Sequence, residues 1–253
     1  MEKKISQAVF GKRNCEELLK RLLKEGRPVS EWPYREFLIK KNPSKDLVSL
    51  LEKIPEEIHV RHVSIGDFDS MFPGMNHQGI AFLKKSGSSS FEYSDIEKFF
   101  SEENHEKPVL ILDRIQDVGN FGSIIRTAEC LGVKHIIIPE RDSAMVNDTV
   151  MKTSSGAVHH VNIYRVTNLS QILDRLKENG FWIASASDRG SESWQKISGD
   201  HLVLILGSEG EGVKRILMEK SDYNIRIPMH GKISSMNVSV ACGILLDRIV
   251  NRS

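Results

Sequence analysis

The sequence contains few cysteines and no long apolar run. Its three cysteines, Cys15, Cys130 and Cys242, are far apart in the 253 residues and form no C-x-x-C spacing. This pattern does not indicate a disulfide framework or a zinc site, and it fits a reducing compartment. No segment approaches the roughly 20 apolar residues that span a bilayer, and the opening MEKKISQAVF lacks an apolar core of signal-peptide length. We therefore expect a cytoplasmic protein with no membrane partner.

A large net charge is also absent. The chain has 35 basic and 34 acidic side chains and a formal net charge of +1, so a site for a polyanion would have to be a local patch. The nine histidines include no pair with convincing ligand spacing, and we expect the adjacent His159 and His160 to point in opposite directions on a strand. We therefore expect no metal site.

The amino-terminal part shows the pattern of a small α/β domain. After Val9 the residues favour a helix with leucines 18, 19, 22 and 23 on one side. Residues 58–65 and 77–83 alternate as strands. Residues 84–107 contain SGSSS, mixed acidic residues and few large aliphatics, which is typical of a linker, although Phe99 and Phe100 are candidates for a short helix that docks on a domain. We therefore predict a domain at 1–84 and a linker at 85–107.

Basic residues cover the other side of that first helix. Lys20, Arg21, Lys24 and Arg27 give the region a local positive bias that could contact phosphates. A solvated helix face explains the same residues equally well.

The carboxyl-terminal part, 108–253, alternates strand and helix. Apolar runs at 109–113, 133–139, 161–166, 181–187 and 201–207 read as strands, and the segments between them include candidate helices at 123–132 and 169–180. This order predicts a mostly parallel sheet with helices on both faces.

Polar loops follow two of these strands and precede the last helix. They contain Asp117 and Asn120, then Glu209, then Ser235 and Asn237. The loop with Glu209 and the loop with Ser235 and Asn237 each follow an apolar segment that we expect to be a strand, and loops at the carboxyl ends of parallel strands can face one ligand. The helix from Val238 onward carries apolar residues on more than one side, which predicts that it is buried on more than one side and that the protein is a dimer.

The three loops, DRIQDVGNFGSIIRTAE, LILGSEGEGV and IPMHGKISSMNVSVACGILL, together resemble the motifs of the SpoU (TrmH-like) branch of the SPOUT RNA methyltransferases. The resemblance spans roughly residues 108–253, and VFGKRN and HQGIA near the amino terminus are similar to the subgroup that 2'-O-methylates a guanosine of 23S ribosomal RNA. Family members commonly have proline where this chain has Val118 and leucine where it has Met236. Neither departure removes a reactive side chain, so turn rigidity is affected more than chemistry.

The resemblance implies a fold that periodicity alone does not predict. It implies an α/β protein with a small amino-terminal α/β RNA-binding domain and a carboxyl-terminal α/β trefoil-knot methyltransferase domain. Such knots are rare exceptions among folds. It also implies a homodimer whose RNA site is completed across the subunit interface.

The resemblance further implies S-adenosylmethionine as the methyl donor, held by backbone atoms at Gly207, Ile227 and Met236. The residue types agree, because glycine permits close main-chain approach and the other two side chains offer apolar walls. The glycines at 207, 210 and 212 have the wrong order for a G-x-G-x-x-G dinucleotide site. A glycine after a strand is also a common turn former, so Gly207 alone does not distinguish the two explanations.

The family pattern marks Arg126 for the ribose hydroxyl or its adjacent phosphate, with Asn120, Glu209, Ser235 and Asn237 completing the pocket. Methyl transfer to a hydroxyl needs alignment and charge placement but no metal. Because a guanidinium stays protonated, we expect Arg126 to position phosphate and not to act as a base. A lone arginine on a helix is otherwise usually a surface or salt-bridge residue.

These observations favour 2'-O-methylation of ribosomal RNA, at a guanosine of 23S RNA. A transfer-RNA 2'-O-methyltransferase would share the three motifs. A non-catalytic RNA-binding homologue is the alternative from another class, and retention of the five polar candidates argues against it.

Overall fold

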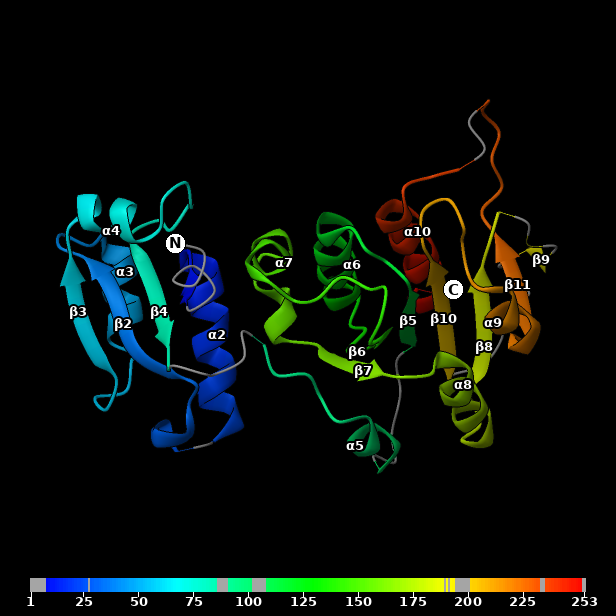
Figure 1. Cartoon of the computed structure of the whole chain (residues 1–253), viewed down its shortest axis with the longest axis horizontal. Helices are drawn as coiled ribbons and strands as arrows, with labels where there is room; N and C mark the ends of the chain where they lie inside the picture. The colour runs from blue at the N-terminus through cyan, green and yellow to red at the C-terminus, as the bar shows by residue number, and fades with distance from the viewer. Residues whose placement is uncertain are drawn as a thin grey trace. The chain divides into compact units, whose positions relative to one another are not determined.

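The computed structural model describes residues 8–26, 28–85, 91–101, 108–188, 190, 192–193, 201–232 and 235–251. Contacts divide the chain into two units, each with its own sheet (Figure 1). Unit 1 contains Met1–Glu92 and Val146–His160, and unit 2 contains Tyr93–Met145 and Val161–Ser253. The domain bounds drawn from the sequence stay predictions. Among the described helices, none has the length and apolar character to cross a membrane.

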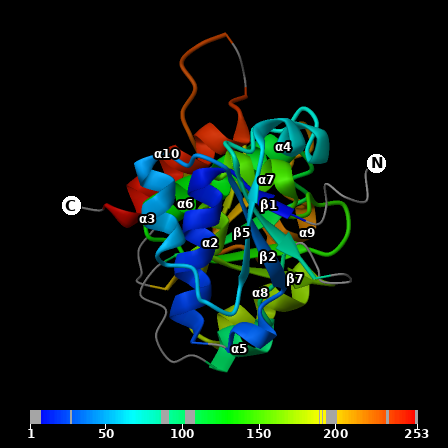
Figure 2. The ribbon, with the colours of Figure 1, turned by 90° about the vertical axis from the view of Figure 1, so that its left-hand side faces the viewer.

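Unit 1 is a four-stranded sheet in the order β1-β4-β2-β3. Its strands are β1 (Ala8–Phe10), β2 (Tyr34–Lys40), β3 (His59–Val63) and β4 (Ile80–Lys84). Its helices are α2 (Lys12–Glu25), η1 (Val29–Glu31), α3 (Lys45–Leu51), α4 (Ile65–Met71), α7 (Asp148–Thr153) and η2 (Ala157–His159). In Figure 2, where unit 1 faces the viewer, α2 and α3 are neighbours, and Lys12 pairs with Asp46 at 2.9 Å between them.

The central strand β2 was missed by the sequence patterns. Its apolar residues Phe37, Leu38 and Ile39 are all 0 % exposed, because the strand lies between β4 and β3 and is covered on both faces. The charged residues Arg35 and Glu36 interrupt the apolar run in the sequence. A strand buried on both faces does not show the alternation that marks a half-buried one.

Two details of unit 1 differ from the sequence-based expectations. Leu23 is 48 % exposed, so the apolar side of α2 does not include it. His159 ends the 3-10 helix η2 and His160 follows it as the C-cap, so the two histidines do not lie on a strand.

The basic side of α2 is partly neutralised by acids on the same helix. Lys20 pairs with Glu17 at 2.9 Å, and Arg21 pairs with Glu25 at 2.7 Å. Spacings of three and four residues place such pairs on one helix face. These pairs favour the interpretation of this face as solvated surface. Arg27 lies outside the described residues.

Unit 2 contains a seven-stranded sheet in the order β7-β6-β5-β10-β8-β11-β9, in which every described pairing is parallel. Its strands are β5 (Val109–Asp113), β6 (His135–Pro139), β7 (Asn162–Val166), β8 (Trp182–Ala186), β9 (Glu192–Ser193), β10 (Leu202–Gly207) and β11 (Tyr223–Arg226). Its helices are α5 (Ile96–Ser101), α6 (Val118–Cys130), α8 (Leu169–Glu178), α9 (Arg215–Lys220) and α10 (Val238–Val250). The predicted parallel α/β architecture is confirmed. The knot stays a prediction.

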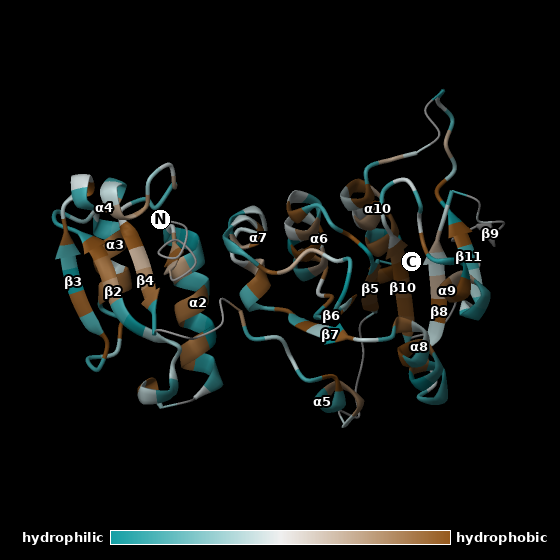
Figure 3. Ribbon diagram, in the orientation of Figure 1, coloured by the Kyte–Doolittle hydropathy of each residue, from teal (hydrophilic) through white to brown (hydrophobic). Residues whose placement is uncertain are grey.

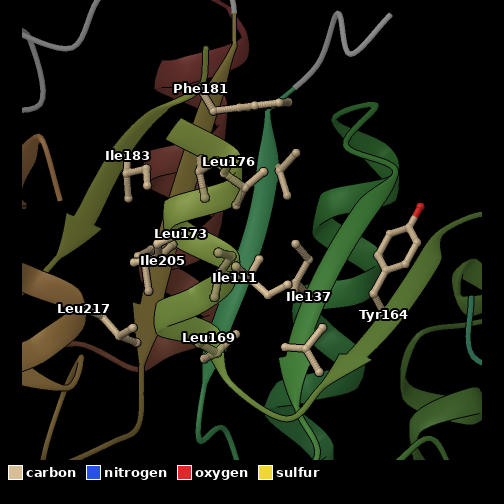
Figure 4. Close-up of a cluster of buried hydrophobic side chains, with 14 of the residues drawn as sticks. Ile111, Ile137, Tyr164, Leu169, Leu173, Leu176, Phe181, Ile183, Ile205 and Leu217 are labelled. Atoms are coloured by element: carbon tan, nitrogen blue, oxygen red, sulfur yellow. The ribbon is translucent and has the colours of Figure 1, made fainter. Parts of the chain in front are cut away.

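Helices cover both faces of this sheet. Ile111 and Ile205, paired in register, pack with Leu173 of α8 on one face (Figure 4). Because side chains alternate along a strand, the intervening residues of β5 and β10 point to the other face. There α10 contacts both β10 and α6. Figure 3 shows β5 and β10 as strongly apolar, which is expected of strands buried on both faces.

The predicted helix around Phe99 is also confirmed. It is α5, and Phe99 is 0 % exposed within the same cluster as the α8 leucines. This segment therefore belongs to the core of unit 2.

Candidate active site

Three loops meet at one edge of the unit 2 sheet. They follow β5, follow β10 and precede α10, and because the strands are parallel, the loops after β5 and β10 emerge at the same edge (Figure 1). The first loop is fixed by Asp117, whose Oδ1 accepts a 2.6 Å hydrogen bond from the Asn120 backbone N–H and so caps α6.

A hydrogen-bond network of three side chains joins the three loops. Asn120 Nδ2 donates to Glu209 Oε1 over 2.8 Å. Asn237 Nδ2 donates to the same oxygen over 3.1 Å and to Asn120 Oδ1 over 3.0 Å. The structure therefore brings together three of the five polar residues predicted from the sequence. Their catalytic roles stay predictions.

Asn237 uses both ends of its amide. Its Oδ1 accepts hydrogen bonds from the backbone N–H and the hydroxyl of Ser239, at 2.9 and 2.6 Å, and so caps α10. Its Nδ2 is thereby directed at Glu209 and Asn120. One residue thus begins the helix and orients the network.

The loop carrying Glu209 is held by residues that the sequence patterns did not single out. Asp113, 0 % exposed at the end of β5, accepts a 2.8 Å hydrogen bond from the backbone N–H of Lys214. Arg114, with a left-handed φ of 60°, pairs with Asp113 and Glu211 and donates to the carbonyl of Gly212 over 3.2 Å. Burial disfavours the charged guanidinium, but bonds to Glu211 and Asp113 outweigh this and raise the pKa of Arg114. In the sequence, the only sign of this role is an Asp-Arg pair at the end of an apolar run.

A cavity of about 1290 Å³, here the large cavity, opens beside the network. Gly207, Ile227 and Met236, the predicted cofactor residues, all line it, as do Ser235 and Glu209. Ser235 and Met236 are exposed, so they are accessible to a ligand. Its lining combines apolar residues and glycine backbone with many polar and charged side chains, among them Asp188, Asn224 and Arg226.

Gly207 is required by its own loop. A Cβ there would lie 2.0 Å from the carbonyl carbon of Gly212 and 2.1 Å from the nitrogen of Val213. These are backbone atoms of the turn that returns past β10, so they cannot rotate away. The close approach of the Gly212 and Val213 backbone therefore explains why residue 207 is glycine.

Arg126 lies apart from the network in the same chain. It is exposed on α6, lines neither described cavity, and has no hydrogen bond or ion pair to any described residue. Arg126 follows Asn120 by six residues, which is roughly 9 Å along a helix and about 240° around it. A single chain therefore does not bring Arg126 into the site.

Comparisons with known proteins agree on one family. A model described as the SpoU rRNA Methylase family matches residues 107–247. A Bacillus subtilis protein assigned to the TrmH family of tRNA/rRNA methyltransferases, YacO, is 35 % identical over 216 residues, which is 84 % of each chain. A Staphylococcus aureus protein assigned to the same family is 39 % identical over 180 residues, covering 70 % of this chain and 71 % of that protein.

A solved structure has the same fold. The SpoU methyltransferase AviRb from Streptomyces viridochromogenes, in complex with the cofactor AdoMet, has a TM-score of 0.77 at 20 % identity. The likeness covers 97 % of this chain and 89 % of that chain. At this identity the likeness concerns the fold alone.

Proposed function

This chain belongs to the SpoU rRNA methylase family of TrmH-like tRNA/rRNA methyltransferases, and we propose that it methylates the 2'-hydroxyl of a ribosomal RNA nucleotide, a guanosine of 23S RNA. The observation that carries the proposal is the network of Asn120, Glu209 and Asn237 at the rim of the large cavity. It places a carboxylate and two amides from three loops where a bound cofactor and a hydroxyl could meet.

The cofactor in this proposal is S-adenosylmethionine, which supplies an activated methyl group on a cationic sulfonium. The large cavity suits it, because the lining offers apolar walls at Ile227 and Met236 and backbone atoms at Gly207. AviRb, which shares the fold, was solved with AdoMet. A cationic donor also needs no phosphate-binding cradle.

Glu209 is proposed to orient the reacting hydroxyl. Its Oε1 accepts both amide hydrogen bonds, while its Oε2 has no partner among the described residues. That oxygen is free to accept a hydrogen bond from a ribose 2'-hydroxyl. Because Asn120 and Asn237 hold the carboxylate from two sides, its direction is set before RNA binds.

Arg126 is proposed to act in the site of a partner copy. Two apolar residues of α10, Val240 and Ile244, are 51 % and 37 % exposed, so the predicted burial of this helix on more than one side is not achieved in a single chain. The α10 helix packs on α6, where Gly243 faces Thr127, the residue after Arg126. A homodimer formed through the exposed face of α10 would cover Val240 and Ile244. It would also bring Arg126, on the neighbouring α6, toward phosphate in the partner's site.

The experiment is methyl transfer to unmodified RNA. Purified protein is given labelled S-adenosylmethionine with in vitro transcribed 23S, 16S or transfer RNA, and the 2'-O-methylated nucleotide is mapped. Methylation of 23S RNA at a guanosine supports the proposal, and methylation of transfer RNA alone would establish the alternative. Binding of S-adenosylhomocysteine without any methylation would favour a non-catalytic RNA-binding protein.

A further inference from the structure

A second cavity adjoins the network. This small cavity has a volume of about 470 Å³ and is lined by residues of the loops after β5, β6 and β10 and by the first turns of α6 and α10. Its walls include Asn120, Glu209, Arg114, Glu211 and Asp142. The cofactor proposal for the large cavity does not use it.

The two cavities meet at Glu209. Five residues line both of them, so Glu209 of the network forms part of the wall between two compartments; the five are Arg114, Ser208, Glu209, Glu211 and Val238. A transfer reaction between a small cofactor and a nucleotide needs two adjoining sites with the reacting groups at the junction. The small cavity therefore fits the acceptor nucleotide if the large cavity holds the methyl donor.

The size of the small cavity restricts what it can accept. A cavity of about 470 Å³ is in the range of small-molecule sites and cannot admit a double helix. A single nucleotide turned out of its stack can enter such a pocket and be read on its Watson–Crick edge.

Only one carboxylate of this cavity is without a partner among the described residues. Glu209 accepts from two amides, and Asp117 caps α6. Glu211 pairs with Arg114. Asp142 is exposed and has no hydrogen bond or ion pair within the described chain, yet it lines the cavity.

The chain holds Asp142 in place by its neighbours. The backbone N–H of Ala144 donates to the carbonyl of Ile115 over 2.7 Å, and the hydroxyl of Ser143 reaches the same carbonyl at 3.4 Å. Ile115 is 3 % exposed and also lines the cavity. Asp142 itself has a φ of 59°, a conformation that aspartate and asparagine adopt more readily than most residues. The loop after β6 is thus tied to the cavity, with Asp142 in its wall.

A carboxylate selects among bases by chemistry. An ionised carboxylate only accepts hydrogen bonds, through two oxygens. Guanine presents two adjacent donors, N1–H and the 2-amino group, which match the two oxygens. Adenine, cytosine and uracil each place an acceptor beside their donor on this edge, so none can make both bonds.

We propose that the small cavity receives the base of the target nucleotide and that Asp142 makes the site specific for guanosine by pairing with its N1–H and 2-amino group. This inference rests on the proposed function, and it adds the residue that reads the base. Asp142 is a specificity residue here, and it takes no part in moving the methyl group.

The test compares guanosine with inosine, which lacks only the 2-amino group. Once the target in 23S RNA is mapped, synthetic stem-loops of that sequence carry guanosine or inosine at that position, and kcat/KM for methylation is measured. We expect the wild-type protein to prefer guanosine about tenfold or more. Asparagine tolerates the same backbone conformation, but it turns one acceptor into a donor. In Asp142→Asn, kcat/KM for the guanosine stem-loop should therefore fall to the value for the inosine stem-loop.

Glu140→Gln is the matched control, since it makes the same charge change on the same loop at an exposed residue outside the small cavity. It should keep the wild-type preference. Both variants should bind S-adenosylhomocysteine as the wild type does, which shows that they fold. An unchanged guanosine preference in Asp142→Asn overturns this inference and leaves the proposed function standing. A mapped target other than guanosine overturns this inference and the choice of guanosine in the proposed function, but not the methyltransferase activity. Absence of any RNA methylation by the wild type overturns both.

Discussion

Asn237 donates a 3.0 Å hydrogen bond from its Nδ2 to Oδ1 of Asn120, a residue 117 positions earlier in the chain. The bond links the start of α10 to the first turn of α6. Because Glu209 accepts from both amides, each of the three loops fixes the other two. We therefore expect a substitution at any one of the three residues to disturb the positions of the other two.

Asn237→Asp tests that unit without removing the helix cap. Aspartate caps a helix about as well as asparagine, so the cap itself should lose less than about 0.5 kcal/mol, and any larger loss of stability comes from the two broken amide hydrogen bonds and the contact with Glu209. The new oxygen faces Glu209 Oε1 and Asn120 Oδ1, which are both acceptors, so methylation should fall at least about tenfold. Urea unfolding and methyl incorporation measure the two effects separately.

Asn168→Ala is the control variant, because it removes a helix cap and leaves the network intact. Asn168 caps α8 through bonds to the N–H groups of Ser170 and Gln171, and it lines neither described cavity. Its removal should cost about 1 kcal/mol of stability and leave the methylation rate of the folded protein unchanged.

Full activity in Asn237→Asp would show that the network does not orient the reacting groups.

Mixed dimers test whether Arg126 works in the partner's site. Arg126→Ala and Glu209→Gln should each be inactive alone. If sites are shared, a hybrid has one site with both residues intact, so random exchange of subunits should restore about a quarter of wild-type activity. If both residues act within one chain, no site of the hybrid is intact and mixing restores nothing.

Gly207→Ala should damage the loop that carries Glu209. Its Cβ would lie 2.0 Å from the Gly212 backbone, so the turn has to move. We expect a loss of at least about 2 kcal/mol in stability and weaker binding of S-adenosylhomocysteine, measured by thermal unfolding and calorimetry. Gly231→Ala is the control, because nothing lies within 4 Å of a Cβ at that position. Equal behaviour of the two variants would contradict the close packing at Gly207.

His159 should make unit 1 sensitive to acid. Burial, then the nearby Arg21 and His160, lower the pKa of this histidine from 6.5 to about 3, and both ring nitrogens lack a partner within the described chain. Above pH 6.5 the ring is neutral in both states. Between 6.5 and 3 the unfolded chain takes up a proton that the folded chain does not, so stability falls as pH falls, by at most about 1.4 kcal/mol per pH unit from this group.

His159→Phe should flatten that part of the pH dependence, measured by urea unfolding between pH 7 and 4. His62→Gln removes a histidine that is exposed on β3 and should leave the slope unchanged. A slope that persists in His159→Phe would assign the acid sensitivity to other groups.

Local patterns in the sequence determined five of the seven described strands of unit 2 and the residue types of its loops, but not β9 or the bounds of β11. The apolar runs of β5 and β10 predicted buried parallel strands, and Asp117 and Asn237 stand where helix caps belong. These signals are visible without the structure because side-chain period and capping depend on residues only a few positions apart.

Tertiary structure alone decided which loops meet and which residues remain outside. The bond between Asn237 and Asn120 depends on the strand order of the sheet, which no local period encodes. The same order ties Asp113 and Arg114 to the Glu209 loop and leaves Arg126 on another side of α6. Contacts between residues a hundred positions apart are set by how whole strands and helices pack, and that packing is what places a carboxylate between two cavities.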